Sequence, residues 1–180
     1  MSGTATPDDT RRGVLIEAAT IGVTTGAYGI SFGALSVTSG LSVWQTMALS
    51  ALMFTGASQF ALVSVLAGGG SAVAAVAGSA LLGLRNLFYG LRMRQILQPS
   101  AALSVPAAQL TIDESTAMAL AHYDRPEPRP ALAFWSTGLS VFVLWNLGSL
   151  IGALGASSIG DPQRWGLDAA VPAAFLALLW

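Results

Sequence analysis

Long apolar stretches separated by short polar turns make up most of this chain. A helix that rises about 1.5 Å per residue needs roughly 20 apolar residues to cross the hydrocarbon core of a bilayer. Four stretches approach or exceed that length, and a twelve-residue apolar stretch ends the sequence: 14–37, 43–67, 71–89, 131–154 and 169–180. The pattern predicts an all-α fold, a polytopic membrane helix bundle with about five to six membrane segments, some of them broken. We expect a polar tail at 1–13 and a single integral membrane domain at 14–180.

The region 98–123 fits this pattern less well. Two prolines interrupt it, and the carboxylates of Asp113 and Glu114 lie within it. We interpret it as a broken or partly interfacial membrane segment. Thr111 precedes the acids, and the run Thr-Ile-Asp-Glu predicts a capping box in which the Thr111 and Glu114 side chains satisfy the first helical N–H groups.

A polar run interrupts the middle of the second apolar stretch, Phe54-Thr55-Gly56-Ala57-Ser58-Gln59-Phe60. Hydrocarbon has no water to satisfy polar groups, so such a run must face protein, a cavity or a bound solute. A glycine flanked by hydroxyls and an amide allows local unwinding, which exposes backbone N–H and C=O groups for recognition. The alternative is that Thr55, Ser58 and Gln59 only form hydrogen bonds with neighbouring helices.

Glycines recur at helical spacing in two of the stretches, at 22, 26, 29 and 33 and again at 148, 152 and 155. Such stripes of small residues let helix backbones approach closely. The alternative is that they leave room for a solute or let the helix unwind. The sequence therefore predicts close helix packing along both stripes.

The same two stretches carry a faint internal repeat. Gly29, Gly33, Ala34, Leu35 and Ser39 recur 119 positions later as Gly148, Gly152, Ala153, Leu154 and Ser158. With two further residues of drift, Trp44 corresponds to Trp165 and Phe54 to Phe175. We interpret this match as an internal structural repeat, and we expect it to be inverted, as in many membrane folds. Trp180 then corresponds to Gln59, so we expect the chain to be incomplete at its C-terminus.

The composition narrows the class of protein. Hydrophobic residues make up 53% and charged residues 9%, against about 25% charge in soluble domains, and the mean hydropathy is +0.64. A net charge of −1 without lysine does not suggest a nucleic-acid surface. The chain has no cysteine, one histidine, no metal-ligand spacing and no P-loop or G-x-S-x-G motif. We therefore expect no enzymatic activity, no cofactor and no metal site.

The arginines leave the orientation open. If every segment crosses fully, four of them share one side and three the other: Arg11, Arg12, Arg125 and Arg129 against Arg92, Arg94 and Arg164. This imbalance is too small for the positive-inside rule to decide, and we favour a cytoplasmic N-terminus. A broken or re-entrant second segment would reverse part of the tally.

Three motifs in order resemble the AzlC family of branched-chain amino acid permeases. They are the run 54–60, then Leu84-Arg85-Asn86-Leu87-Phe88-Tyr89-Gly90-Leu91, then Asp113-Glu114. The similarity extends from about Glu17 to the end of the chain. It implies a multi-pass protein of the cytoplasmic membrane that exports branched-chain amino acids by a secondary, ion-coupled mechanism. It also implies a small integral membrane partner of the AzlD type.

Two features depart from the family pattern. Members tend to have histidine at the position of Asn86, which affects possible proton chemistry. They also continue beyond Trp180, which questions whether this chain transports anything alone.

A branched-chain amino acid is a zwitterion with an apolar end, and the candidate substrate-binding residues divide accordingly. Backbone N–H groups around Gly56 to Ser58, with Arg85, are candidates for the carboxylate. Asp113 or Glu114 would hold the ammonium, and Phe54 and Phe60 the apolar side chain. The whole expected set is Phe54, Thr55, Gly56, Ser58, Gln59, Phe60, Arg85, Asn86, Asp113 and Glu114.

Several alternatives to these roles stay open. In one alternative, Asp113 or Glu114 carries a coupling proton, which burial would favour. In another, Arg85 extends to the membrane interface. In a third, Arg85 pairs with one of the acids, and neither is then available to the substrate. A channel-like or structural membrane subunit without transport activity of its own would share the glycine stripes.

Overall fold

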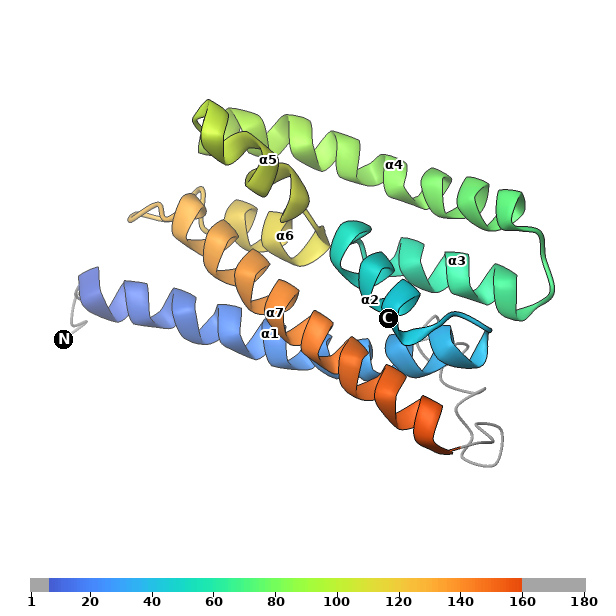
Figure 1. Ribbon diagram of the computed structural model, residues 1–180. Helices are drawn as coiled ribbons and strands as arrows, with labels where there is room; N and C mark the ends of the chain where they lie inside the picture. The colour runs from blue at the N-terminus through green and yellow to red at the C-terminus, as the bar shows by residue number, and fades with distance from the viewer. Residues whose placement is uncertain (1–6, 160–180) are drawn as a thin grey trace.

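The computed structural model describes residues 7–159, which form seven helices and no strands within that range (Figure 1). In chain order they are α1 (Pro7–Thr38), α2 (Val43–Leu52), α3 (Ala57–Ala67), α4 (Ala72–Leu97), α5 (Ala101–Gln109), α6 (Asp113–Ala121) and α7 (Pro130–Ile159). The predicted all-α fold is confirmed. The final apolar stretch at 169–180, like Arg164, Trp165 and Phe175, lies outside the described residues.

Three of the described helices are long and apolar enough to cross a membrane. These spans are Thr10–Thr38 in α1, Ala72–Leu97 in α4 and Pro130–Ser158 in α7. The four remaining helices are short and form two pairs, α2 with α3 and α5 with α6. The fold is thus a helical membrane bundle with two broken segments and three helices of crossing length, called the crossing helices below.

The pair α2–α3 forms a hairpin, here called hairpin 1, that enters the bundle and leaves it at the same end. The Gln59 side chain donates hydrogen bonds to the carbonyl oxygens of Leu49 and Ser50, at 2.9 and 3.2 Å. A continuous helix would hold residues ten positions apart at about 15 Å. The segment 43–67 is therefore the broken, re-entrant one that the sequence left open, because the chain reverses at Gly56, where φ is +58° and L side chains are disfavoured.

The pair α5–α6 forms hairpin 2, which enters from the opposite end. Asp113 at the start of α6 pairs with Arg85 in the middle of α4, at 2.6 Å. Tyr123, just after α6, lies beside Arg92 near the end of α4, with 5.5 Å from guanidinium to ring centroid. α6 therefore runs in the same direction as the second half of α4, and the two hairpins meet tip to tip inside the bundle (Figure 1).

The start of α6 differs in detail from the predicted capping box. The helix begins after Ile112, whose N–H donates to the Ser115 hydroxyl at 3.2 Å. The Thr111 hydroxyl instead donates to the Ala107 carbonyl oxygen on α5, at 2.7 Å. The capping-box prediction is wrong for two reasons. The Thr111 hydroxyl bonds back to α5, and Ser115, one residue after Glu114, accepts from the Ile112 N–H in place of Glu114.

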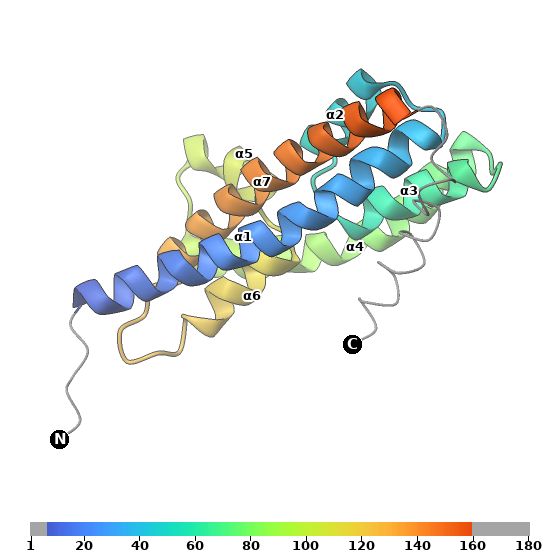
Figure 2. The same ribbon diagram turned by 90° about the horizontal axis from the view of Figure 1, so that it is seen from below.

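α1 and α7 lie side by side and parallel, and they share the most extensive helix contact of the bundle (Figure 2). A Cβ placed on Gly33 would overlap the backbone of Ser149, and one placed on Gly152 would overlap the backbone of Ile30. The glycine stripes thus pack the two helices backbone to backbone, as expected.

These contacts are reciprocal, since Ser149 follows Ile30 by the same 119 positions that separate Gly152 from Gly33. The two helices that the repeat pairs, α1 and α7, are therefore related by a rotation about an axis parallel to both helices. The expectation of an inverted relationship between them is wrong, because α1 and α7 run in the same direction. An inverted arrangement exists elsewhere: α1–α3 and α4–α6 each consist of a long helix and a hairpin, and they point in opposite directions (Figure 1).

The described arginines outside the bundle interior gather at one end, here called the arginine-rich end. Because the hairpins do not cross, α4 finishes at the end where α1 begins, and the His122–Glu17 contact of 2.9 Å ties α6 to the same end of α1. Arg92 and Arg94 therefore join Arg11, Arg12, Arg125 and Arg129. The division of these six arginines between two sides held only if every segment crosses, and the two hairpins do not meet that condition.

Candidate functional site

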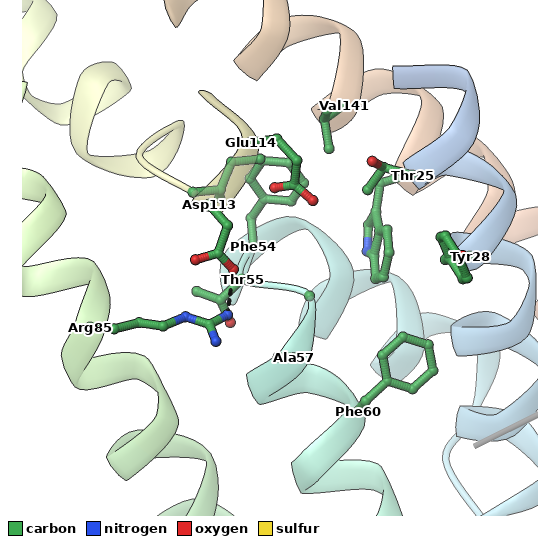
Figure 3. A pocket seen from close by; sticks show the side chains of 13 residues that line it. Thr25, Tyr28, Phe54, Thr55, Ala57, Phe60, Arg85, Asp113, Glu114 and Val141 are labelled. Carbon is green, nitrogen blue, oxygen red and sulfur yellow. Dashed lines mark ion pairs between the residues drawn. The ribbon is translucent and has the colours of Figure 1, made fainter. Parts of the chain in front are cut away.

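A cavity of about 190 Å³ lies where the tips of the two hairpins meet the middle of the crossing helices (Figure 3). It is referred to below as the central cavity. Five elements contribute to its wall: α1, hairpin 1, α4, hairpin 2 and α7. The lining residues are Thr25, Tyr28, Phe54, Thr55, Gly56, Ala57, Phe60, Arg85, Ile112, Asp113, Glu114, Val141 and Trp145.

Hairpin 1 brings an uncapped helix N-terminus to this cavity. Gly56 is the N-cap of α3, and no side chain satisfies the first N–H groups of that helix. A Cβ at Gly56 would meet nothing within 4 Å, so the backbone borders open space. Free N–H groups and the positive end of the helix dipole together make this position suited to an anion such as a carboxylate.

Hairpin 2 and α4 bring the charged groups. Arg85 and Asp113 form an ion pair of 2.6 Å across the cavity wall, with side chains 32% and 45% exposed. The pairing that the sequence left open is thus present, and Figure 3 shows it beside Thr55. Glu114 points into the cavity from the same tip and makes no ion pair with any described residue. It is the acid left available for a cationic group.

Aromatic side chains form the apolar part of the wall. Phe60 packs edge-on against Trp145 of α7, with centroids 6.1 Å apart, and Trp145 stacks on Phe32 of α1 at 5.7 Å. Phe54 packs edge-on against Phe142 at 5.0 Å. Because these rings hold one another across three elements, α1, hairpin 1 and α7, the wall beside the polar groups is fixed by packing.

Seven of the ten expected site residues line this cavity: Phe54, Thr55, Gly56, Phe60, Arg85, Asp113 and Glu114. The other three lie close by but not on its wall. Ser58 is buried beneath α4 near Gly83, Gln59 is buried within hairpin 1, and Asn86 lines a second cavity between α4 and α5. Gln59 therefore braces the hairpin, as in the alternative that gave it only helix contacts.

Six lining residues had no place in the expected set. Ala57 and Ile112 belong to the hairpin tips themselves, and the other four come from the long helices: Thr25 and Tyr28 of α1 and Val141 and Trp145 of α7. These four face the hairpin tips because the glycine stripes fix how α1 and α7 lie against each other. Their signal in the sequence is indirect: Thr25 and Tyr28 each directly precede a stripe glycine, and Val141 and Trp145 lie seven and three residues before Gly148.

A family model described as AzlC protein matches residues 20–159 of the chain. The chain belongs to the AzlC family. The match covers all three motifs and every lining residue of the central cavity. Neither the curated proteins nor the solved structures contain a match. Membership of the AzlC family, together with the three apolar crossing helices, gives a membrane protein with a transport-related function.

Proposed function

We propose that the chain is a permease subunit of the AzlC family that moves branched-chain amino acids across the cytoplasmic membrane, outward and by a secondary mechanism. The observation that carries this proposal is the composition of the central cavity. One cavity wall combines free helix N–H groups, a cation, an unpaired acid and an aromatic surface. These are the groups that a zwitterion with an apolar side chain requires at membrane depth.

The geometry suggests a division of roles. The substrate carboxylate would bind the N–H groups after Gly56 and compete with Asp113 for Arg85. The ammonium would bind Glu114, because that acid has no partner among the described residues. The branched side chain would lie against Phe60 and Trp145, because this part of the wall is apolar and an aliphatic group has no hydrogen bonds to satisfy.

Export of leucine from preloaded cells tests the proposal, with the chain expressed beside its membrane partner. We expect Asp113→Ala and Glu114→Gln to reduce export at least several-fold. Glu127→Gln, in the loop before α7 and away from the cavity, is the matched control and should export normally. Normal export by the Asp113 and Glu114 variants would remove both acids from the site.

Counterflow separates a permease from a channel-like or structural subunit. Vesicles that contain a carrier and are preloaded with unlabelled leucine accumulate labelled leucine against its gradient for a time. Vesicles that contain a channel only equilibrate the labelled leucine. We expect proteoliposomes holding the chain and its partner to show this transient accumulation. Simple equilibration would favour the channel.

We also propose that the arginine-rich end faces the cytoplasm. All six described arginines outside the bundle interior lie there, and short loops rich in arginine stay on the cytoplasmic side. Hairpin 1 would then enter from the outside and hairpin 2 from the cytoplasm. Reporter fusions after residue 40 and after residue 125 should report opposite sides, and equal reports would contradict this orientation.

The partner that we propose is a small integral membrane protein of the AzlD type, and this rests on the family resemblance. α4 is the least covered of the crossing helices, with 11% of its apolar window buried, so it offers the largest lipid-facing surface for such a protein. Co-purification of the two tagged proteins from detergent is the test. Failure to co-purify, with leucine transport by the chain alone, would contradict the partnership.

A further inference from the structure

A second cavity of about 340 Å³ lies between the last half of α4 and hairpin 2. Residues of α4 on one helical face and residues of α5 form its walls. It extends from Arg94 and Pro99 at the arginine-rich end to Asn86 and Thr111 near the bundle centre. α4 and α5 make little direct backbone contact along this length, which leaves the space open.

The wall of this second cavity is not purely apolar. Arg94 lies exposed at the outer end, Ser104 lies midway, and Asn86 lies at the inner end. The Asn86 amide oxygen is buried without a hydrogen-bond partner among the described residues. Arg94 and the Asn86 amide are polar groups that acyl chains cannot satisfy, so a wall that carries both favours water or a polar solute over lipid.

Only two short backbone segments separate this cavity from the central cavity. Arg85 lines the central cavity and the next residue, Asn86, lines the second one. On hairpin 2, Asp113 lines the central cavity and Thr111 the second one. The Arg85–Asp113 ion pair joins these two segments, so it holds together the wall that divides the cavities.

We propose that the second cavity is the route between the central cavity and the arginine-rich end, and that the Arg85–Asp113 ion pair is its gate. This rests on the proposed transport of a zwitterion. An arriving amino acid offers a carboxylate to Arg85 and an ammonium to Asp113, so it replaces each partner of the pair as it separates them. Arg94 at the outer end attracts the carboxylate before it reaches the gate.

Cysteine labelling tests the route directly, because the chain has no native cysteine. Single variants Ser104→Cys and Ala108→Cys place a thiol on the cavity wall. Val105→Cys is the matched control on the same helix, since Val105 is 76% exposed on the outer surface and does not line the cavity. A charged, membrane-impermeant methanethiosulfonate is applied from the arginine-rich side of sealed vesicles.

We expect both wall thiols to react faster than the control by more than about tenfold, because the charged reagent does not enter hydrocarbon. Leucine should slow the reaction at Ala108→Cys. Equal rates at all three positions, as in a groove filled with lipid, would overturn the route.

For the gate, Thr55→Cys in the central cavity should label slowly from this side and faster when Asp113→Asn is added. An unchanged rate there would overturn the gate.

Labelling does not require transport, so the route and the proposed function fail separately. Export of leucine together with equal labelling at all positions would refute the route alone. The expected labelling pattern without slowing by leucine and without leucine export would refute the substrate, and would support the route for another polar solute.

Discussion

The Gln109 side-chain amide donates a 2.7 Å hydrogen bond to the carbonyl oxygen of Ala51. Gln109 is the last residue of α5 and Ala51 lies in the last turn of α2, so this bond joins the tips of the two hairpins. Ala51 shares that turn with the two carbonyls that accept from Gln59. Two glutamines thus donate to carbonyls of the last turn of α2, of which those of Ser50 and Ala51 have no backbone donor among the described residues.

Gln109→Leu should loosen the contact between the hairpins. Side-chain hydrogen bonds between membrane helices contribute about 0.6 kcal/mol on average and up to about 1.7. We expect a small fall in the melting temperature of the detergent-solubilised protein and a larger fall in leucine export, since the tips form the central cavity. Gln95→Leu, at an exposed position on α4, is the control. Equal effects of both substitutions would show that Gln109 has no special role.

The main crossing helices could be predicted from the sequence, because α1, α4 and α7 are long apolar runs and lipid leaves helix as their main option. The breaks in 43–67 and 98–123 were also expected, but the sequence did not decide whether each segment turns back or continues across. The run 43–67 is as apolar as a crossing helix, and its reversal depends on backbone torsion at Gly56 and on the Gln59 hydrogen bonds. Composition does not reveal either feature.

Much of the site was likewise predictable, because polar groups inside an apolar segment are costly and so mark a function. That reasoning identified Gly56, Arg85 and Asp113. It could not identify Tyr28 or Trp145, since aromatic residues in an apolar helix carry no such cost, and only the packing of α1 on α7 turns them toward the hairpin tips.

Gly56→Ala should impair transport although there is space for the added methyl group. The φ of +58° at Gly56 is disfavoured for alanine by roughly 1–2 kcal/mol, so the hairpin tip must shift or strain. We expect a clear loss of leucine export with normal membrane insertion. Gly78→Ala in α4 is the control, since that position is helical and open and should tolerate alanine. Full export by Gly56→Ala would show that the tip conformation is not required.

Gly33→Ala and Gly152→Ala should each destabilise the contact between α1 and α7. In both cases the added carbon would overlap backbone atoms of the facing helix, which cannot rotate away. Overpacking of this kind costs about 1–3 kcal/mol. The melting temperature in detergent should fall for both by similar amounts, because the two sites are reciprocal. Gly155→Ala meets no atom within 4 Å and should leave stability unchanged or raised. A strong effect at only one stripe would contradict the reciprocal packing.

Neutralising the Arg85–Asp113 pair separates its structural role from its role in transport. Arg85→Leu alone leaves a carboxylate without its partner at membrane depth, where insertion scales assign a charge about 2.5–3.5 kcal/mol. Since Asp113 is 45% exposed to the cavity, we expect the loss of stability to be smaller than that. Adding Asp113→Asn removes the stranded charge, so the double variant should melt at a higher temperature than Arg85→Leu. Leucine export should stay low in the double variant, because Arg85 would no longer bind the carboxylate. Export restored along with stability would mean that the pair only holds α4 to hairpin 2.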